Sequence, residues 1–416
     1  RQDMSAKAKA DKKNLVETIK QEIKEHNLFK YPDITMLLKV KGDVQKTLEK
    51  IKKVGGNTIY DPNFSKGSHI PFVIVTLPPK KLVDEEFMSS LPIEMAQIDH
   101  PSLSEIRPMM SESLKDVPLE NVYVPLADVN LDSFRNRQRG KGLGEDTVVA
   151  IVDTGIDATH PVFGDRVVYW TDTTEASLVV LEKTLPESSE LSLPEIFSSA
   201  KIIKTGFIDE KALAVQESDE TKSQKEAGMD INQNGTKDDR FLVVAAQSSD
   251  GLKMALIDTN GDGQFSEDEK FAVADYNQAM NRPELLSEKK KKIKKMVSFS
   301  EGAKKVAYPL MLESTDEGEV IKLYLGIDSS SHGTHVAGIV AADGLQIQGA
   351  APKAKLMSIK VCSGITCTSS AMLKGLIETF YNPYGIIPDV VNISLGSHEK
   401  EEESIYSSLM RDLSAK

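Results

Sequence analysis

From residue 147 onwards, short and almost wholly apolar runs alternate with amphipathic helical segments. The runs TVVAIVD (147–153), KLMSIKV (355–361) and PDVVNISLG (388–396) lack the polar–apolar alternation of a half-exposed strand. Such runs are typical of strands buried on both faces of a parallel sheet. Helical spacing follows in TSSAMLKGLIETFYN (368–382) and EEESIYSSLMRDLSA (401–415). The alternation predicts an α/β fold built on a doubly wound parallel sheet.

A different order of elements precedes this region. A charged helix is expected over residues 1–30. Residues 31–107 are expected to form strand, helix, strand, strand, helix and strand in the segments ITMLLKV, DVQKTLEKIKKVGG, NTIY, PFVIVTL, PPKKLVDEEFMSS and IEMAQID. This βαββαβ order predicts a compact ferredoxin-like domain. The Pro-, Ser- and Met-rich stretch after it is expected to be an exposed linker.

Residues 108–416 make up the remaining domain, and a long insertion interrupts it at about residues 175–325. The insertion is polar and contains strand patterns such as FLVVAAQ and VIKLYLGID, so we expect it to be rich in β-structure. Its basic run EKKKKIKKM (288–296) is interpreted as a solvated helix or loop rather than a binding patch.

Composition argues against a nucleic-acid-binding protein and against a membrane-spanning one. The 416 residues carry a formal net charge of −12, which argues against a main role on nucleic acid. No apolar run approaches the roughly 18 residues that a membrane-spanning helix needs. The chain opens Arg1-Gln2-Asp3-Met4 without an apolar signal core, so we expect that any export signal was removed or never existed.

Two polar side chains stand where α/β proteins place functional groups. Asp153 ends the apolar run in VVAIVDTGID, at the expected carboxyl edge of the sheet. His332 stands in SSSHGTHVAGIVAAD, directly before an apolar helical segment. Taken singly, Asp153 is explained as a turn cap and His332 as a structural core histidine. Their occurrence in this order, ahead of VVNISLG, favours a joint catalytic role.

The motifs DTGID, HGTHVAG and VVNISLG resemble those of the subtilisin-like serine proteases, the subtilase or peptidase S8 family. The resemblance implies that Asp153 is the triad aspartate and His332 the general base, and that Ser394, Leu395 and Gly396 form an edge that pairs with substrate backbone. His335, the second histidine of HGTH, is expected to be structural and to pack beneath the site. The long insertion between Asp153 and His332 is similar to the tripeptidyl-peptidase II branch of the family.

One part of the family pattern is missing. A subtilase needs a serine nucleophile, whose hydroxyl is activated when the histidine takes its proton. The 416 residues contain no GTS nucleophile motif. We expect a serine endopeptidase whose chain here is an N-terminal portion with an incomplete core, held non-covalently to a companion C-terminal chain that carries the serine. The alternative is a catalytically inactive binding or regulatory module with the same fold.

The βαββαβ segment resembles the inhibitory prodomain of secreted subtilases. By this resemblance its C-terminal tail, at about residues 99–113, would lie through the active cleft and be cleaved near residues 107–111. Because the chain is continuous from residue 31 to Asp153, we expect a zymogen. The expected substrates of the protease are proteins or peptides. A permanent accessory domain is the alternative.

Two segments of the insertion match a Ca²⁺-binding loop, in which alternate oxygen ligands curl round the cation and a glycine makes the sharp turn. In the stronger match the expected ligands are Asp258, Asn260, Asp262, Gln264 and Glu269. In the weaker match they are Asp230, Asn232, Asn234, Thr236 and Asp238. The weaker loop has Phe241 where the last acidic ligand belongs.

The two cysteines, Cys362 and Cys367, lie in VCSGITC. They are either two unrelated buried thiols or a small disulfide-closed loop, and the family resemblance favours the disulfide. A disulfide implies an oxidising compartment, so a secreted or periplasmic protein is expected.

Overall fold

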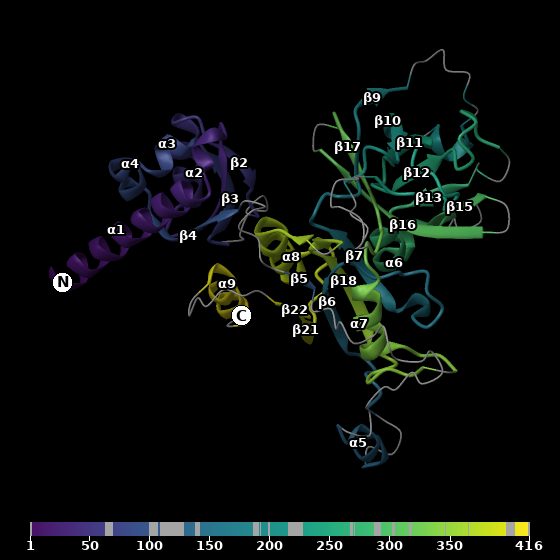
Figure 1. Cartoon of the computed structure of the whole chain (residues 1–416). Helices are drawn as coiled ribbons and strands as arrows, with labels where there is room; N and C mark the ends of the chain where they lie inside the picture. The colour runs from purple at the N-terminus through teal and green to yellow at the C-terminus, as the bar shows by residue number, and fades with distance from the viewer. Residues whose placement is uncertain are drawn as a thin grey trace. The chain divides into compact units, whose positions relative to one another are not determined.

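A computed structural model of the chain defines the fold (Figure 1). The residues that the structure describes are 2–62, 70–99, 107–108, 129–137, 142–185, 191, 193–198, 200–214, 228–266, 269, 271–286, 293–301, 304–315, 318–345, 347–364, 366–396 and 404–414. Most of the expected linker and residues 288–292 of the basic run lie outside them. Within these ranges, no helix is both long and apolar enough to cross a membrane.

The chain forms two compact units. The first contains residues 1–106, 367–380 and 396–416, and the second contains residues 107–366 and 381–395.

The first unit is built on a four-stranded antiparallel sheet in the order β2-β3-β1-β4. Its elements follow the chain as β1 (Ile34–Val40), α2 (Val44–Lys53), β2 (Asn57–Tyr60), β3 (Phe72–Leu77), α3 (Pro79–Leu82), α4 (Glu85–Ser90) and β4 (Ile93–Asp99). The predicted βαββαβ ferredoxin-like order is therefore confirmed. The second predicted helix is split in two, because the Asp84 side chain accepts the Phe87 N–H and starts a new helix there.

Among the described residues, four further helices belong to the first unit. The N-terminal helix α1 (Gln2–Glu25) buries one face through Val16, Ile19 and Ile23, which join the core of the sheet, and the short 3₁₀ helix η1 (Leu28–Lys30) follows it. The other two helices come from the far end of the chain and are α8 (Ser369–Tyr381), nearly all of which lies in this unit, and α9 (Ile405–Ser414).

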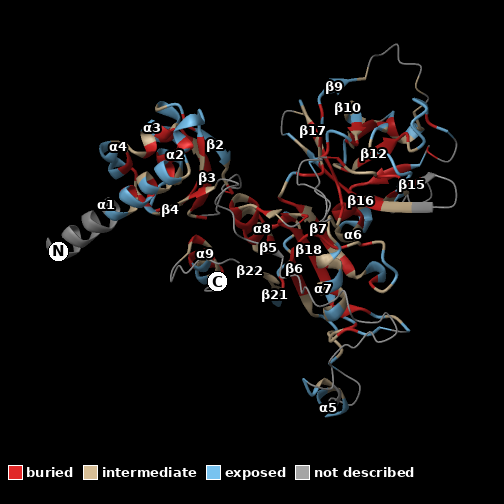
Figure 2. Ribbon diagram, viewed as in Figure 1, coloured by how far each residue is buried: buried red, intermediate tan, exposed pale blue. Residues whose placement is uncertain are grey.

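The second unit contains the predicted parallel sheet, in the order β21-β6-β18-β7. The strands are β6 (Val148–Asp153), β7 (Val167–Asp172), β18 (Lys355–Lys360) and β21 (Val390–Asn392). Figure 2 shows β6, β18 and β7 buried along most of their length, as their apolar sequences predict. This sheet confirms the predicted α/β fold class.

The insertion forms two more sheets in the second unit. Among the described residues, a six-stranded sheet has the order β14-β13-β12-β11-β10-β9 and a four-stranded sheet the order β15-β16-β17-β8. The first contains β9 (Lys183–Thr184), β10 (Ala200–Asp209), β11 (Arg240–Ser248), β12 (Lys253–Ile257), β13 (Ala272–Ala274) and β14 (Ile293–Lys294). The second contains β8 (Leu178–Leu181), β15 (Met296–Glu301), β16 (Lys304–Ser314) and β17 (Ile321–Leu325).

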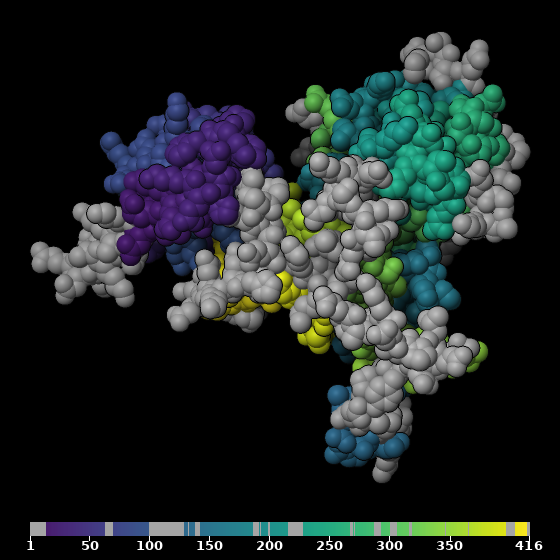
Figure 3. Space-filling model, viewed as in Figure 1, coloured from purple at the N-terminus to yellow at the C-terminus, as the bar shows by residue number. Residues whose placement is uncertain are grey.

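One apolar core joins these two sheets. Phe241 from the first sheet stacks edge-on against Phe299 from the second, with ring centroids 4.9 Å apart. Figure 3 shows the residues of β9–β14 as one continuous teal body. The insertion is therefore a packed β-structure.

Short elements connect these sheets. They are α5 (Leu131–Arg137), α6 (Tyr276–Asn281), α7 (His332–Ala341), η3 (Gly164–Arg166), η4 (Glu195–Phe197), η5 (Pro283–Leu286), and the small strands β5 (Arg107–Pro108), β19 (Cys362–Ser363), β20 (Thr366–Cys367) and β22 (Leu395–Gly396).

Candidate active site

Asp153 and His332, which lie 179 residues apart in sequence, meet in the second unit. Asp153 is the last residue of β6 and has no exposed surface, while His332 is the first residue of α7 and its side chain is 10% exposed. The imidazole Nδ1 lies 2.7 Å from Asp153 Oδ1. Because an ionised carboxylate only accepts, Nδ1 is the donor and Nε2 is the nitrogen left to take a proton.

The turn after Asp153 is tied to the start of α7. The Thr154 N–H donates to Asp153 Oδ1 at 2.7 Å, and the Thr154 hydroxyl accepts the Gly333 N–H at 2.9 Å. The same hydroxyl donates to Asp328 Oδ1 at 2.7 Å, and that oxygen also accepts the N–H of Ser331. These bonds fix the aspartate and histidine segments against each other.

Glycine at position 333 is a steric requirement of this approach. A Cβ atom there would lie 2.0 Å from the Gly155 carbonyl oxygen, which is far inside contact distance. Gly155 itself has φ +112°, in the region that favours glycine. The glycines of DTG and HGT therefore let the two segments touch.

A lysine that the sequence analysis missed lies at the same sheet edge. Lys360 ends β18, between Asp153 of β6 and Asp172 of β7 in register, and it is fully buried. Burial lowers the pKa of its ammonium, and the carboxylates of Asp172, Asp328 and Asp153 oppose that effect. The available signal was a lysine at the end of a mostly apolar strand.

The expected substrate edge is a short strand. β22 (Leu395–Gly396) pairs with β5 (Arg107–Pro108) in a two-stranded sheet. Ser394, just before it, donates its hydroxyl to Asn392 Oδ1 at 2.9 Å. The backbone at Leu395 is thus able to pair with an extended segment.

The stronger calcium-type loop is folded around its first and last acidic residues. Asp258, nearly fully buried, accepts the N–H of Asp262 at 3.2 Å and of Gly263 at 2.7 Å. Glu269 accepts the Thr259 N–H at 2.7 Å. Asn260 Oδ1 accepts the Asp262 N–H at 3.0 Å, so the alternate oxygens line a tight turn.

Burial raises the pKa of Asp258. Burial acts in the same sense on Glu269, but the bonds from Ser266 and Thr259 outweigh it and lower the pKa of that carboxyl.

The weaker loop has the same turn and gains a carboxylate from elsewhere in the chain. Asp230 accepts the N–H of Asn234 at 3.0 Å and of Gly235 at 2.7 Å, matching the bonds of Asp258. Glu210, fully buried, accepts the Ile231 N–H at 2.6 Å, as Glu269 accepts the N–H of Thr259. Sequence reasoning missed Glu210 because it lies outside the loop, just after β10.

The remaining expected ligands are placed as follows. Asn232 donates to Asp239 Oδ2 at 2.9 Å, and Thr236 donates through its N–H to Asn234 Oδ1 at 2.8 Å, while Gln264 and Asp238 lie in the two loops. Within the described ranges, no three His, Cys, Asp or Glu side chains converge into a metal-holding group. The loops therefore supply donors of the right kind without an assembled acidic cluster.

Cys362 and Cys367 are both fully buried and disulfide-bonded. The expectation for His335 was wrong, because this side chain is exposed on α7 instead of packed beneath the site.

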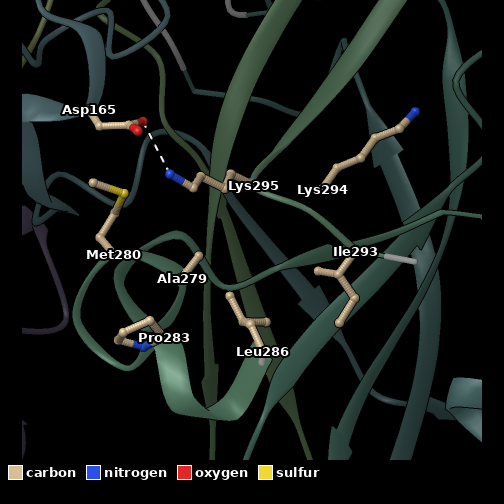
Figure 4. A pocket seen from close by; sticks show the side chains of 8 residues that line it. All are labelled: Asp165, Ala279, Met280, Pro283, Leu286, Ile293, Lys294 and Lys295. Carbon is tan, nitrogen blue, oxygen red and sulfur yellow. Dashed lines mark hydrogen bonds and ion pairs between the residues drawn. The ribbon is translucent and has the colours of Figure 1, made fainter. Parts of the chain in front are cut away.

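A separate cavity of about 480 Å³ lies between the insertion and η3. It is lined by Asp165, Ala279, Met280, Pro283, Leu286, Ile293, Lys294 and Lys295. Figure 4 shows Asp165 pointing towards Lys295, with which it forms an ion pair at 3.1 Å. Neither Asp153 nor His332 lines this cavity, so it is not part of the site around that pair.

The family model "Subtilase family" (peptidase S8) matches residues 144–415, so the chain belongs to the subtilase family of serine peptidases. The match contains both Asp153 and His332.

Two known proteins are similar to the chain. Pyrolysin of Pyrococcus furiosus is 23% identical over 431 residues, an alignment that covers 88% of this chain and 28% of pyrolysin. The crystal structure of tripeptidyl peptidase 2 (TPP II) matches 67% of this chain and 26% of that one, with 17% identity and a TM-score of 0.47. The chain thus spans little more than a quarter of the curated relative it matches.

Proposed function

We propose that the protein hydrolyses peptide bonds as a serine endopeptidase, with Asp153 and His332 as two members of its triad. The observation that carries the proposal is the buried 2.7 Å contact between His332 Nδ1 and Asp153 Oδ1. It holds the imidazole in the tautomer whose Nε2 takes the proton of an attacking hydroxyl. Asp153 then stabilises the imidazolium as it forms.

The nucleophilic serine belongs, in this proposal, to a segment outside the 416 residues, either further along one chain or on a companion chain. The absence of a GTS motif from the sequence supports it.

Casein hydrolysis combined with intact-mass analysis of the purified protein tests the proposal. We expect hydrolysis only from preparations that contain residues beyond these 416. Hydrolysis by the 416-residue chain alone would contradict the external serine, and its absence from every preparation would favour the inactive binding module.

The substrate is proposed to bind in extended form along β22. The pairing of β22 with β5 supports this, because it shows an extended backbone accepted at that edge. Since β5 lies at residues 107–108, within the tail expected to be cleaved, it supports a zymogen whose own tail takes the place of substrate.

The N-terminal βαββαβ region is proposed to act as an inhibitory prodomain that docks on α8 and α9. Asp99, at the end of β4, accepts the N–H groups of Ser369 and Ser370, both at 3.1 Å, and so caps the start of α8. Lys39 of β1 pairs with Asp412 of α9 at 3.1 Å. Both contacts join the sheet to helices from the family-matched part of the chain.

Asp99→Ala is expected to weaken this docking about fivefold, because removing a helix cap costs roughly 1 kcal/mol. After activation, the N-terminal region should dissociate faster, which a time course of substrate hydrolysis measures. Asp33→Ala, which removes an exposed carboxylate of the same unit, is the matched control. Equal activation times for the two variants would contradict the docking role.

We further propose that the two insertion loops bind Ca²⁺. The chemistry of the donors supports this, since both loops offer carboxylate and amide oxygens at alternate positions, which hard cations prefer. The ligands would be those of the sequence analysis, with Glu210 as the closing carboxylate of the weaker loop in place of Phe241. A bound cation would neutralise carboxylates that are otherwise costly to bury.

Calorimetric titration of chelator-treated protein should find two Ca²⁺ sites. Asp258→Ala should remove one, and Glu210→Gln should weaken the other by at least about tenfold, because each loses a charged ligand. At each site, calcium at 100 times the dissociation constant should stabilise the protein by about 2.7 kcal/mol. Asp165→Asn, an exposed carboxylate outside both loops, is the control. Unchanged binding in Asp258→Ala would contradict the first site.

Export to an oxidising compartment is the remaining part of the proposal. The disulfide-bonded state of Cys362 and Cys367 supports it. Mass spectrometry of the native protein should find both cysteines oxidised, and free thiols would contradict it.

A further inference from the structure

Lys360 occupies an unusual position at the carboxyl edge of the parallel sheet. It ends the central strand β18, and in register it lies beside Asp153 on one neighbouring strand and Asp172 on the other. Its side chain has no exposed surface. A buried ammonium carries a large desolvation cost, so it persists only where the surroundings compensate for it.

Two hydrogen bonds define what the ammonium does there. Lys360 Nζ donates to the Thr154 carbonyl oxygen at 2.9 Å and to the Ser329 hydroxyl at 2.8 Å. Thr154 directly follows Asp153, and Ser329 stands three residues before His332. The lysine therefore joins the segment that carries the aspartate to the segment that carries the histidine.

Among the described residues, the charged groups that act on Lys360 are all acidic. The carboxylates that act on it are those of Asp153, Asp172 and Asp328. Asp328 is also bonded to Thr154 and Ser331, so it belongs to the same connection between the two segments. A single buried cation thus stands among three acidic groups, one of which is the partner of His332.

We infer that Lys360 is a positioning residue for the Asp153–His332 pair, which it keeps within hydrogen-bonding distance by joining the two segments and balancing the buried negative charge. The inference rests on the proposed catalytic role of that pair. Lys360 itself does not contact the imidazole in this role, and it acts through Thr154, Ser329 and the surrounding carboxylates.

The hydrogen bond between His332 and Asp153 can be observed without any proteolysis. An Nδ1–H that donates to a carboxylate gives a proton signal far downfield of the backbone amides. The chain has seven histidines, so protein labelled with ¹⁵N-histidine gives few signals, and the one lost in His332→Gln is assigned to His332. The rate at which this Nδ1 proton exchanges with water measures the stability of the hydrogen bond between His332 and Asp153.

In Lys360→Met we expect this signal to disappear or to exchange at least about tenfold faster, as for the loss of one charged hydrogen bond. Ser329→Ala removes only one acceptor of the ammonium and should act in the same direction with a smaller effect. If Lys360→Met does not fold, the signal of Ser329→Ala tests the inference instead. Lys353→Met, which breaks a surface ion pair with Asp343 at 2.6 Å, is the control and should leave the signal unchanged.

An unchanged signal in a folded Lys360→Met protein, or in Ser329→Ala when Lys360→Met does not fold, would overturn the inference. Because the NMR signal is measured without proteolysis, it tests the positioning role of Lys360 separately from the proposed catalytic function. A weakened signal in a protein that never hydrolyses peptides would support the positioning role and refute the catalytic one.

Discussion

Replacing His332 by alanine is expected to lower kcat for peptide hydrolysis by about 10⁴- to 10⁶-fold, the loss known for triad histidines. The side chain supplies the base that contacts Asp153 through a hydrogen bond. Without it a serine hydroxyl keeps its proton and remains a poor nucleophile. Initial rates with an internally quenched peptide, measured on protein that contains the serine-bearing segment, provide the test.

His335→Ala is the matched control, because it removes an exposed imidazole three residues further along the same helix. Its rate should stay within about twofold of the unmodified protein, as expected for a surface substitution. Asp153→Asn should lower kcat by about 10⁴-fold, because the amide stabilises the wrong imidazole tautomer. Equal rates for His332→Ala and His335→Ala would contradict the assignment of the base.

Trp170→Ala is expected to destabilise the second unit by about 3–5 kcal/mol, the usual cost of truncating a buried tryptophan. Trp170 is fully buried on β7, in the core that packs against the parallel sheet. Its indole N–H donates to the Ile156 carbonyl oxygen at 2.8 Å, in the turn that follows Asp153. The substitution therefore removes a core side chain and a support of the active-site turn together.

Urea unfolding followed by circular dichroism measures this loss. Trp170→Phe keeps most of the burial but not the donor, so it should cost less than Trp170→Ala. Ile387→Ala changes a side chain that is 69% exposed and should stay within about 0.5 kcal/mol of the original stability. If Trp170→Ala were no more destabilising than Ile387→Ala, the described core would be wrong.

The sequence was sufficient to predict the parts of the site that local patterns encode. Asp153 follows an apolar run and His332 precedes an apolar helix, and parallel strands bring such ends to one sheet edge. The motifs DTG and HGT place glycine at positions 155 and 333, where the two segments are in close contact and a side chain would not fit. The βαββαβ order was predictable for the same reason, because each element has its own periodicity.

Residues that act through tertiary contacts were not predictable in this way. Lys360 appears in sequence as one charge near the end of a strand, and only the register of three strands places it between Asp153 and Asp172. Glu210 lies 20 residues before Asp230 in sequence, yet its carboxylate accepts the N–H groups of Ile231 and Asp239 in the weaker loop. For His335 the prediction was wrong in the opposite direction. Its place in the HGTH motif suggested a buried side chain, but the side chain is exposed on α7.

Labelling with a fluorophosphonate probe, followed by peptide mapping, tests most directly whether Asp153 and His332 activate a serine. We expect a labelled serine in a peptide outside the 416 residues, in the protein with His332 intact and not in His332→Ala. Label on a serine within the 416 residues would contradict the proposed external nucleophile. Absence of label from the folded protein that contains the additional segment would contradict the protease itself.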